Sequence, residues 1–192
     1  MKKKAIVAAL LLLLLFGVSN DTSAYFISTQ KATNVITTGG IRIELQEWAD
    51  EDGTAFTDAV RVLPGKEITK IVTARNVGAN AAWIRMSVAK RVKLAEGVTG
   101  EPDPAQVSLD LNTADWVEKD GWYYYRHLLA PGKTCEPLFT TVRFAEDMDN
   151  VWQQSTITID VELQAVQTAN NGTEAVNAEG WPLSEEGGGN GV

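Results

Sequence analysis

Apolar and polar residues alternate with a period of two along much of the chain, the pattern of β-strands that bury one face. The clearest run is ITIDVEL at 157–163, and IRIEL at 41–45 and WIRMSV at 83–88 repeat it. In WIRMSV the alternation places Trp83 and Arg85 on the face exposed to solvent. The residues expected in the core are Ile41, Ile43, Ile84, Met86, Val88, Ile157, Ile159, Val161 and Leu163.

Further strands are expected at 67–77 (EITKIVTARNV) and 138–144 (LFTTVRF), which follow Pro-Gly turn signals. Asp120-Gly121, between aromatic and β-branched flanks, predicts a two-residue hairpin turn with positive φ. Helical periodicity is scarce, with one candidate turn at 144–153, and the alternation is lost from Thr168 onward. About seven to nine short strands separated by turns predict an all-β fold, an antiparallel β-sandwich of the jelly-roll-like or immunoglobulin-like kind.

The first residues have the order of a secretory signal peptide: Lys2 to Lys4, an apolar run from Ala5 to Val18, and then polar residues. As a helix this run reaches only about 21 Å, which is short for a bilayer core of roughly 30 Å. We therefore expect contact with the membrane only through the uncleaved signal. The small residues Thr22 and Ala24 predict cleavage after Ala24, so that the mature chain begins at Tyr25.

The expected organisation is a signal peptide at 1–24, a single sandwich domain at 25–183 and a flexible Gly-rich tail at 184–192. Loss of the signal removes three lysines and one aspartate, which changes the net charge from −8 to −10. Such an acidic protein is repelled by nucleic acid. The single cysteine, Cys135, cannot form an internal disulfide, and an exported fold without one fits the exterior of a Gram-positive cell.

Candidates for catalysis are few. His127 is the only histidine, so it cannot complete a pair of zinc-binding histidines, and Cys135 is interpreted as a partly buried thiol rather than a nucleophile. The acidic clusters at 50–52 and 146–149 lack the spacing of a known calcium loop, although calcium binding stays open. Asn171-Gly172-Thr173 matches a glycosylation pattern and is interpreted as a turn. We expect no catalytic, cofactor or metal site and no enzyme activity.

The aromatic residues of the 115–125 hairpin allow two interpretations. They pair across strands and fill a core edge, or they form a platform on which sugars stack. The first interpretation is favoured. The residues are Trp116, Trp122, Tyr123, Tyr124 and Tyr125.

Several short motifs occur in an order that resembles the TasA and camelysin family, whose members are exported through a signal peptidase of the SipW type. They are Ala24-Tyr25-Phe26, Ala32-Thr33-Asn34, Gly39-Gly40 and Ile41-Arg42-Ile43. LPGKEITKIVTARNVGANAAWIRMSV and LAPGKTCEPLF are similar to later segments of that family, and the similarity covers most of residues 1–166. Camelysin has been classed as a metallopeptidase, but no zinc-ligand pattern is present here, so that activity is not carried over.

The resemblance implies a jelly-roll-like sandwich and a secreted structural protein of the cell surface or biofilm matrix that assembles with itself, in fibres among the best-known relatives. The segment freed by cleavage, YFISTQKATNVI, could add as a strand to a neighbouring subunit or form the first strand of its own sheet. Its candidate assembly residues are Tyr25, Phe26, Ile27, Val35 and Ile36. The alternatives are a surface module that binds glycan or protein through the aromatic hairpin and, less favoured, a secreted hydrolase.

We predict that the exported protein begins at Tyr25, because Thr22 and Ala24 provide small residues at the third and first positions before the only suitable cut. N-terminal sequencing or the intact mass of the secreted protein checks this. An uncleaved product retained in the membrane would overturn the expected extracellular location.

Overall fold

The structure is a computed structural model that describes residues 24–26, 40–56, 60–62, 64–148, 150–152 and 155–182. The signal segment before Ala24, the tail at 184–192 and the candidate assembly residues Ile27, Val35 and Ile36 lie outside the described residues. In the part of the chain that is described, no helix has the length and apolar character needed to cross a bilayer.

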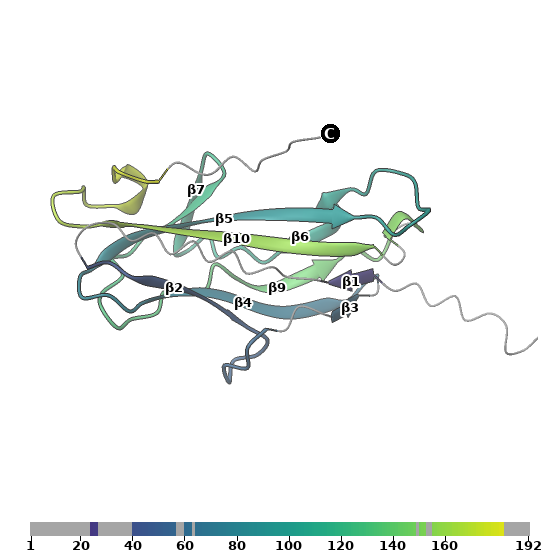
Figure 1. Cartoon of the computed structure of the whole chain (residues 1–192), viewed down its shortest axis with the longest axis horizontal. Helices are drawn as coiled ribbons and strands as arrows, with labels where there is room; N and C mark the ends of the chain where they lie inside the picture. Colours follow the sequence, from purple (N-terminus) through teal and green to yellow (C-terminus); the bar gives the residue numbers. More distant parts are fainter. Residues whose placement is uncertain are drawn as a thin grey trace, which may run out of the picture.

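In the part of the chain that the structure describes, ten strands form two sheets. The sheets pack face to face, as Figure 1 shows. The six-stranded sheet has the order β3-β1-β10-β5-β8-β7, and the four-stranded sheet has the order β2-β4-β9-β6. Their bounds are β1 (Ala24–Phe26), β2 (Ile43–Trp48), β3 (Val60–Val62), β4 (Glu67–Asn76), β5 (Ala82–Lys93), β6 (Val107–Leu109), β7 (Trp116–Lys119), β8 (Trp122–Tyr125), β9 (Phe139–Phe144) and β10 (Thr156–Gln167). The predicted all-β sandwich is confirmed, whereas its jelly-roll-like form stays a prediction.

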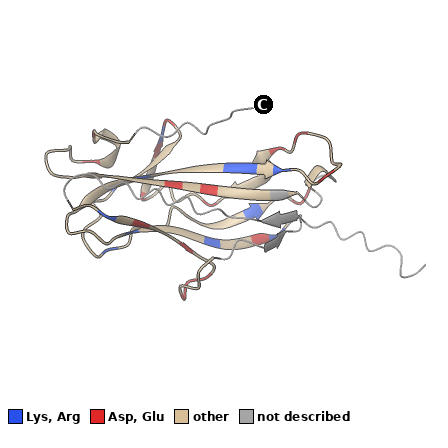
Figure 2. Ribbon diagram, in the orientation of Figure 1, with Lys and Arg blue, Asp and Glu red and all other residues tan. Residues whose placement is uncertain are grey.

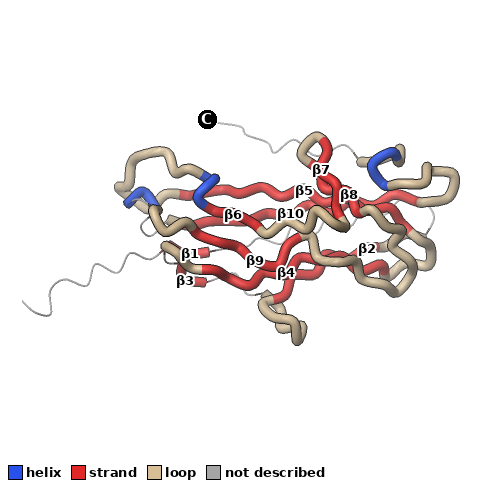
Figure 3. The backbone as a smooth tube through the Cα atoms, turned by 180° about the vertical axis from the view of Figure 1, so that it is seen from behind, coloured by secondary structure: helices blue, strands red, loops and turns tan. Residues whose placement is uncertain are grey.

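Three short 3-10 helices lie at the ends of the sandwich, η1 (Pro104–Gln106) and η2 (Asn150–Trp152) at one end and η3 (Ala175–Asn177) at the other (Figure 3). The helix η2 falls within the predicted helical turn at 144–153. Among the described strand pairs only β1 with β10 is parallel. This pair is the exception to the expected antiparallel arrangement.

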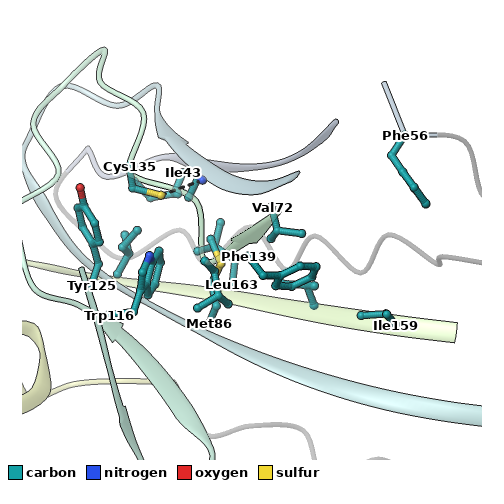
Figure 4. Packing of buried hydrophobic residues seen from close by; sticks show 14 of the residues in the cluster. Ile43, Phe56, Val72, Met86, Trp116, Tyr125, Cys135, Phe139, Ile159 and Leu163 are labelled. Atoms are coloured by element: carbon teal, nitrogen blue, oxygen red, sulfur yellow. Dashed lines mark hydrogen bonds between the residues drawn. The ribbon is translucent and has the colours of Figure 1, made fainter. Parts of the chain in front are cut away.

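The antiparallel pair of β5 and β10 is the longest of the described strand pairs, running from Ala82 opposite Gln167 to Lys93 opposite Thr156. Its inner face supplies much of the core, which continues with aromatic and aliphatic side chains from the other sheet (Figure 4). Eight of the nine predicted core residues are buried, and Val88 is partly buried against them. The period-two pattern therefore identified the inner face correctly.

The prediction that Trp83 and Arg85 face solvent was wrong, because their side chains are only 5% and 9% exposed. Both point to the outer face, but the chain after β10 folds back over that face. Residues of η3 and its surroundings pack on Trp83, Tyr124 and Val166 there. Alternation along a strand distinguishes its two faces and does not show whether a distant segment covers the outer one.

Two turns have conformations that depend on their residue types. Asp120 and Gly121 have φ of 53° and 78°, which confirms the predicted hairpin turn. In the turn between β4 and β5, position 78 has room only for glycine, since a Cβ atom there would lie 2.5 Å from the carbonyl oxygen of Gly40. Buried Asn76 donates to the carbonyl oxygens of Asn80 and Leu129 and accepts from the Gly78 N–H. This asparagine joins the β4–β5 turn to the loop that precedes β9.

Replacing Ile159 with Asp should unfold the domain, because Ile159 is completely buried. An unpaired carboxylate there costs several kcal/mol against a total stability of about 5–15 kcal/mol. Thr158→Asp is the matched control, since its neighbour across the pair is Arg91 on the outer face. Circular dichroism during thermal unfolding should show a folded Thr158→Asp protein and an unfolded Ile159→Asp protein. A stable Ile159→Asp sandwich would contradict the assignment of the inner face.

Candidate assembly site

The described part of the predicted assembly segment is β1, a strand of three residues that occupies an inner position of the six-stranded sheet. Tyr25 lies opposite Thr156 of β10 in parallel register and opposite Arg61 of β3 in antiparallel register. Phe26 in turn lies opposite Ile157 and Val60. In this structure β1 thus pairs within its own chain, one of the two arrangements that the sequence left open. The proposed cleavage point between Ala24 and Tyr25 falls inside this strand.

A buried ion pair lies in the four-stranded sheet, at residues that the sequence did not single out. The Lys70 Nζ is 2.8 Å from Glu47 Oε1, with side-chain exposures of 0% and 3%. The same ammonium group lies 4.3 Å from the centre of the Phe56 ring. The sequence did contain a sign of this buried charge. Glu47 continues the alternation of Ile43 and Leu45, at a position where an apolar residue is expected. The register of β4 shifts between Thr69 and Val72, which bracket Lys70.

Asp110 holds the end of the β6 edge against β9. Its Oδ1 accepts from the N–H groups of Thr140 and Thr141 at 2.8 and 2.6 Å, and its Oδ2 accepts from the Thr140 hydroxyl. Partial burial acts to raise the pKa of Asp110, but these hydrogen bonds outweigh it and the pKa is lowered. The carboxylate thus accepts hydrogen bonds from two successive backbone N–H groups, a role that a backbone carbonyl plays elsewhere in a sheet.

His127 lies on the surface after β8, where its Nε2 is 3.0 Å from Asp115 Oδ1. Hydrogen bonds from Asn112 and then from His127 lower the pKa of Asp115. Among the described residues, no three His, Cys, Asp or Glu side chains gather closely enough to hold a metal ion. In the first acidic cluster, Asp50 accepts a hydrogen bond from the Thr54 N–H and closes a loop.

Cys135 is buried more deeply than the sequence suggested, with 4% of the residue exposed. Its Sγ accepts a hydrogen bond from the Ala74 N–H at 3.1 Å. Burial raises the pKa of the thiol to about 12. Since the thiolate is the nucleophilic form, this environment opposes a catalytic role.

The aromatic hairpin divides its side chains between the two faces of the sheet. Trp116 and Tyr125, with ring centres 5.0 Å apart, belong to the main core. Tyr124 and Trp122 belong to the second cluster on the outer face. Trp116, Tyr124 and Tyr125 are buried, and Trp122 and Tyr123 are half-buried. The arrangement favours the core interpretation of this hairpin over a sugar-stacking platform.

Asn171 forms the turn that its sequence suggested. Its Nδ2 donates to the carbonyl oxygens of Gln167 and Glu179, and its Oδ1 accepts from the Glu179 N–H. Its own carbonyl oxygen accepts from the Trp83 indole. The side-chain amide is therefore engaged in fixing the chain after β10.

No family model, curated protein or solved structure matches this chain.

Asp110 should stabilise the fold in a pH-dependent way. Because its pKa is lowered in the folded state, its contribution is present above the unfolded pKa of about 3.9 and is lost as the pH falls through the folded value. Asp110→Asn should lower the free energy of unfolding by roughly 1–2 kcal/mol at pH 7, with the difference vanishing in acid. Urea unfolding of both proteins between pH 7 and pH 2 measures this. A difference independent of pH would rule out the carboxylate as the cause.

The Cys135 thiol should resist alkylation in the native protein and react on unfolding, because it is buried and its pKa is raised to about 12. Mass spectrometry after brief iodoacetamide treatment, with and without denaturant, reports the modified fraction. Rapid labelling of the native protein would contradict the packing around Ala74.

Proposed function

We propose that this chain is a secreted structural subunit of the cell surface or matrix that assembles with copies of itself by exchange of its N-terminal strand. The observation that carries the proposal is the place of β1. It contains the proposed mature N-terminus, Tyr25, as its second residue and lies between β3 and β10, where another copy of the same strand would find the same backbone partners. Such exchange costs little free energy, because the contacts between subunits are the same as those that the strand makes within its own chain.

The segment that follows β1 is long in sequence. Residues 27–39 join β1 to Gly40, and a fully extended segment of that length spans up to about 45 Å. Because each subunit would donate one strand and accept one, the contact is head to tail and can propagate. The motif order shared with the TasA and camelysin family supports the same conclusion from the sequence.

The alternative functions gain less support. A glycan-binding hairpin would present its aromatic rings to solvent, but Trp116, Tyr124 and Tyr125 are all at least nine-tenths buried. A secreted hydrolase would need an activated nucleophile, and burial disfavours the Cys135 thiolate.

A chain that starts at Gly39 should stay folded and monomeric, because the long β5–β10 pair and the four-stranded sheet remain. The mature chain from Tyr25 should polymerise, slowly or at high concentration. Electron microscopy and light scattering of the two proteins measure the difference.

Added YFISTQKATNVI peptide should bind the chain that starts at Gly39 and block growth from the mature form, while a scrambled peptide of the same composition should do neither. Unfolding of the shortened chain would show that β1 is an integral strand of its own sheet, and the proposal would fail. Polymerisation of the shortened chain would place the contact elsewhere and also reject it.

A further inference from the structure

The outer face of the six-stranded sheet is unusually apolar at one end. Trp83 on β5, Tyr124 on β8 and Val166 on β10 are buried there beneath Ala175 and Ala178. Val117, Trp122, Val176 and Trp181 pack around this second cluster. The chain after β10 thus covers a surface that would otherwise be a contiguous aromatic patch.

Arg85 lies at the edge of this patch with its guanidinium carbon 4.0 Å from the Trp122 ring centre and 4.7 Å from that of Trp181. The Trp181 ring also meets Tyr124 edge-on, with ring centres 5.7 Å apart. Gln164 Oε1 accepts from Nε and Nη2 of Arg85, and the Tyr124 hydroxyl accepts from Nη1. These three hydrogen bonds all come from the sheet itself and none of them involves Trp181.

The covering segment is attached in two parts. Residues 171–179 are fixed by the three hydrogen bonds of the Asn171 side chain. Gly180 follows with φ of 77°, and a Cβ atom there would meet nothing within 4 Å. Beyond this open glycine, Trp181 inserts its ring and the Pro182 carbonyl oxygen accepts from Arg85 Nη2 at 3.2 Å. Trp181 and Pro182 therefore follow directly on a glycine that has a positive φ and open space on the side where a Cβ would lie.

The fit of Trp181 is incomplete, because its indole Nε1 is buried without a hydrogen-bond partner among the described residues. An unsatisfied buried donor weakens the net stability of such a contact. Among the described residues, the sheet offers the dipeptide a stacking surface and the Arg85 guanidinium as a donor. A second copy carries the same dipeptide, which could make the same contacts with Arg85 and Tyr124.

We propose that Arg85, Trp122 and Tyr124 form a recognition slot for a Trp-Pro dipeptide, filled here by the chain's own Trp181-Pro182 and open to that dipeptide from a second copy. This contact is separate from strand exchange at the N-terminus and does not depend on it. It would join subunits through their C-terminal segments only where a chain's own dipeptide does not fill its slot, so a chain that starts at Gly39 and keeps its slot filled is still expected to be monomeric.

The slot is tested with a fluorescent peptide, NAEGWPLSE, which reproduces residues 177–185, and with NAEGAPLSE as its control. Trp181→Ala in the mature chain empties the slot and should bind NAEGWPLSE about ten-fold more tightly than wild type, where the attached dipeptide competes at high effective concentration. NAEGAPLSE should not bind. Val176→Ala is the matched protein control, because it weakens the same cover but leaves Trp181 in place.

Adding Arg85→Lys to Trp181→Ala should reduce peptide binding about ten-fold, since an ammonium group cannot stack as the flat guanidinium does. A chain ending at Gly180 gives a second way to empty the slot if Trp181→Ala does not fold. Equal binding to Trp181→Ala and Val176→Ala, or no binding to either emptied chain, would show that Trp181 is only a structural cover.

Exchange between copies is tested by mixing Trp181→Ala, which has a slot and no dipeptide, with Arg85→Lys, which has the dipeptide and a weakened slot. Sedimentation should detect a mixed dimer that neither protein forms alone. Its absence at concentrations above the measured peptide Kd would reject the second copy as the occupant.

Discussion

The pairing of β5 with β10 is the interaction on which the rest of the structure depends. Twelve residues of each strand stay in continuous antiparallel register. The inner face of this pair meets the four-stranded sheet, and one end of its outer face meets the chain that follows β10. A strand pair covered on both faces must supply apolar or fully satisfied polar groups to each. This is why Arg85 and Gln164 are placed opposite each other and hydrogen-bonded on the outer face.

The two terminal segments attach to the same strand at opposite ends. β1 pairs with Thr156 and Ile157 at the start of β10, whereas the C-terminal cover packs on Val166 near its end. Figure 1 shows the two attachments separated along the length of the sandwich. Exchange of either segment between copies would leave the middle of the β5–β10 pair untouched. Both proposed contacts are therefore compatible with one unchanged core.

On the outer face, basic side chains of β5 lie near acidic side chains of β10, so that their charges partly cancel. Figure 2 shows basic residues along the distal half of β5 beside acidic residues on β10, and Arg91 binds Asp160 across that pair. Solvent screens this pair from the arginine side, since Arg91 is exposed while Asp160 is largely buried. The buried Lys70–Glu47 pair differs, because removing one partner would leave the other charged in the core, a change that typically costs about 3–5 kcal/mol. Buried Arg85 is satisfied instead by neutral acceptors and aromatic rings.

The sequence alone determined the fold class, the inner face and the turns. Alternation identified the core residues of β2, β5 and β10, and Asp120-Gly121 identified its hairpin, because these signals are local: period two follows from strand geometry, and positive φ follows from residue type. It also identified Tyr25 and Phe26 as the start of a strand. Their partners in β3 and β10 were not predictable, since pairing between distant segments leaves no local pattern.

Only the tertiary structure decided what covers the outer face. Arg85 and Trp83 follow the period expected of exposed residues, and the chain after Thr168 shows no periodicity, so neither segment by itself indicated the other. Their association depends on Asn171 turning the chain back and on Trp181 stacking beside Arg85. Likewise Glu47 violates the apolar alternation of its strand and is accommodated by Lys70, 23 positions further along the chain. Burial of a polar group is decided by the partner that reaches it, and that partner is set by the fold as a whole.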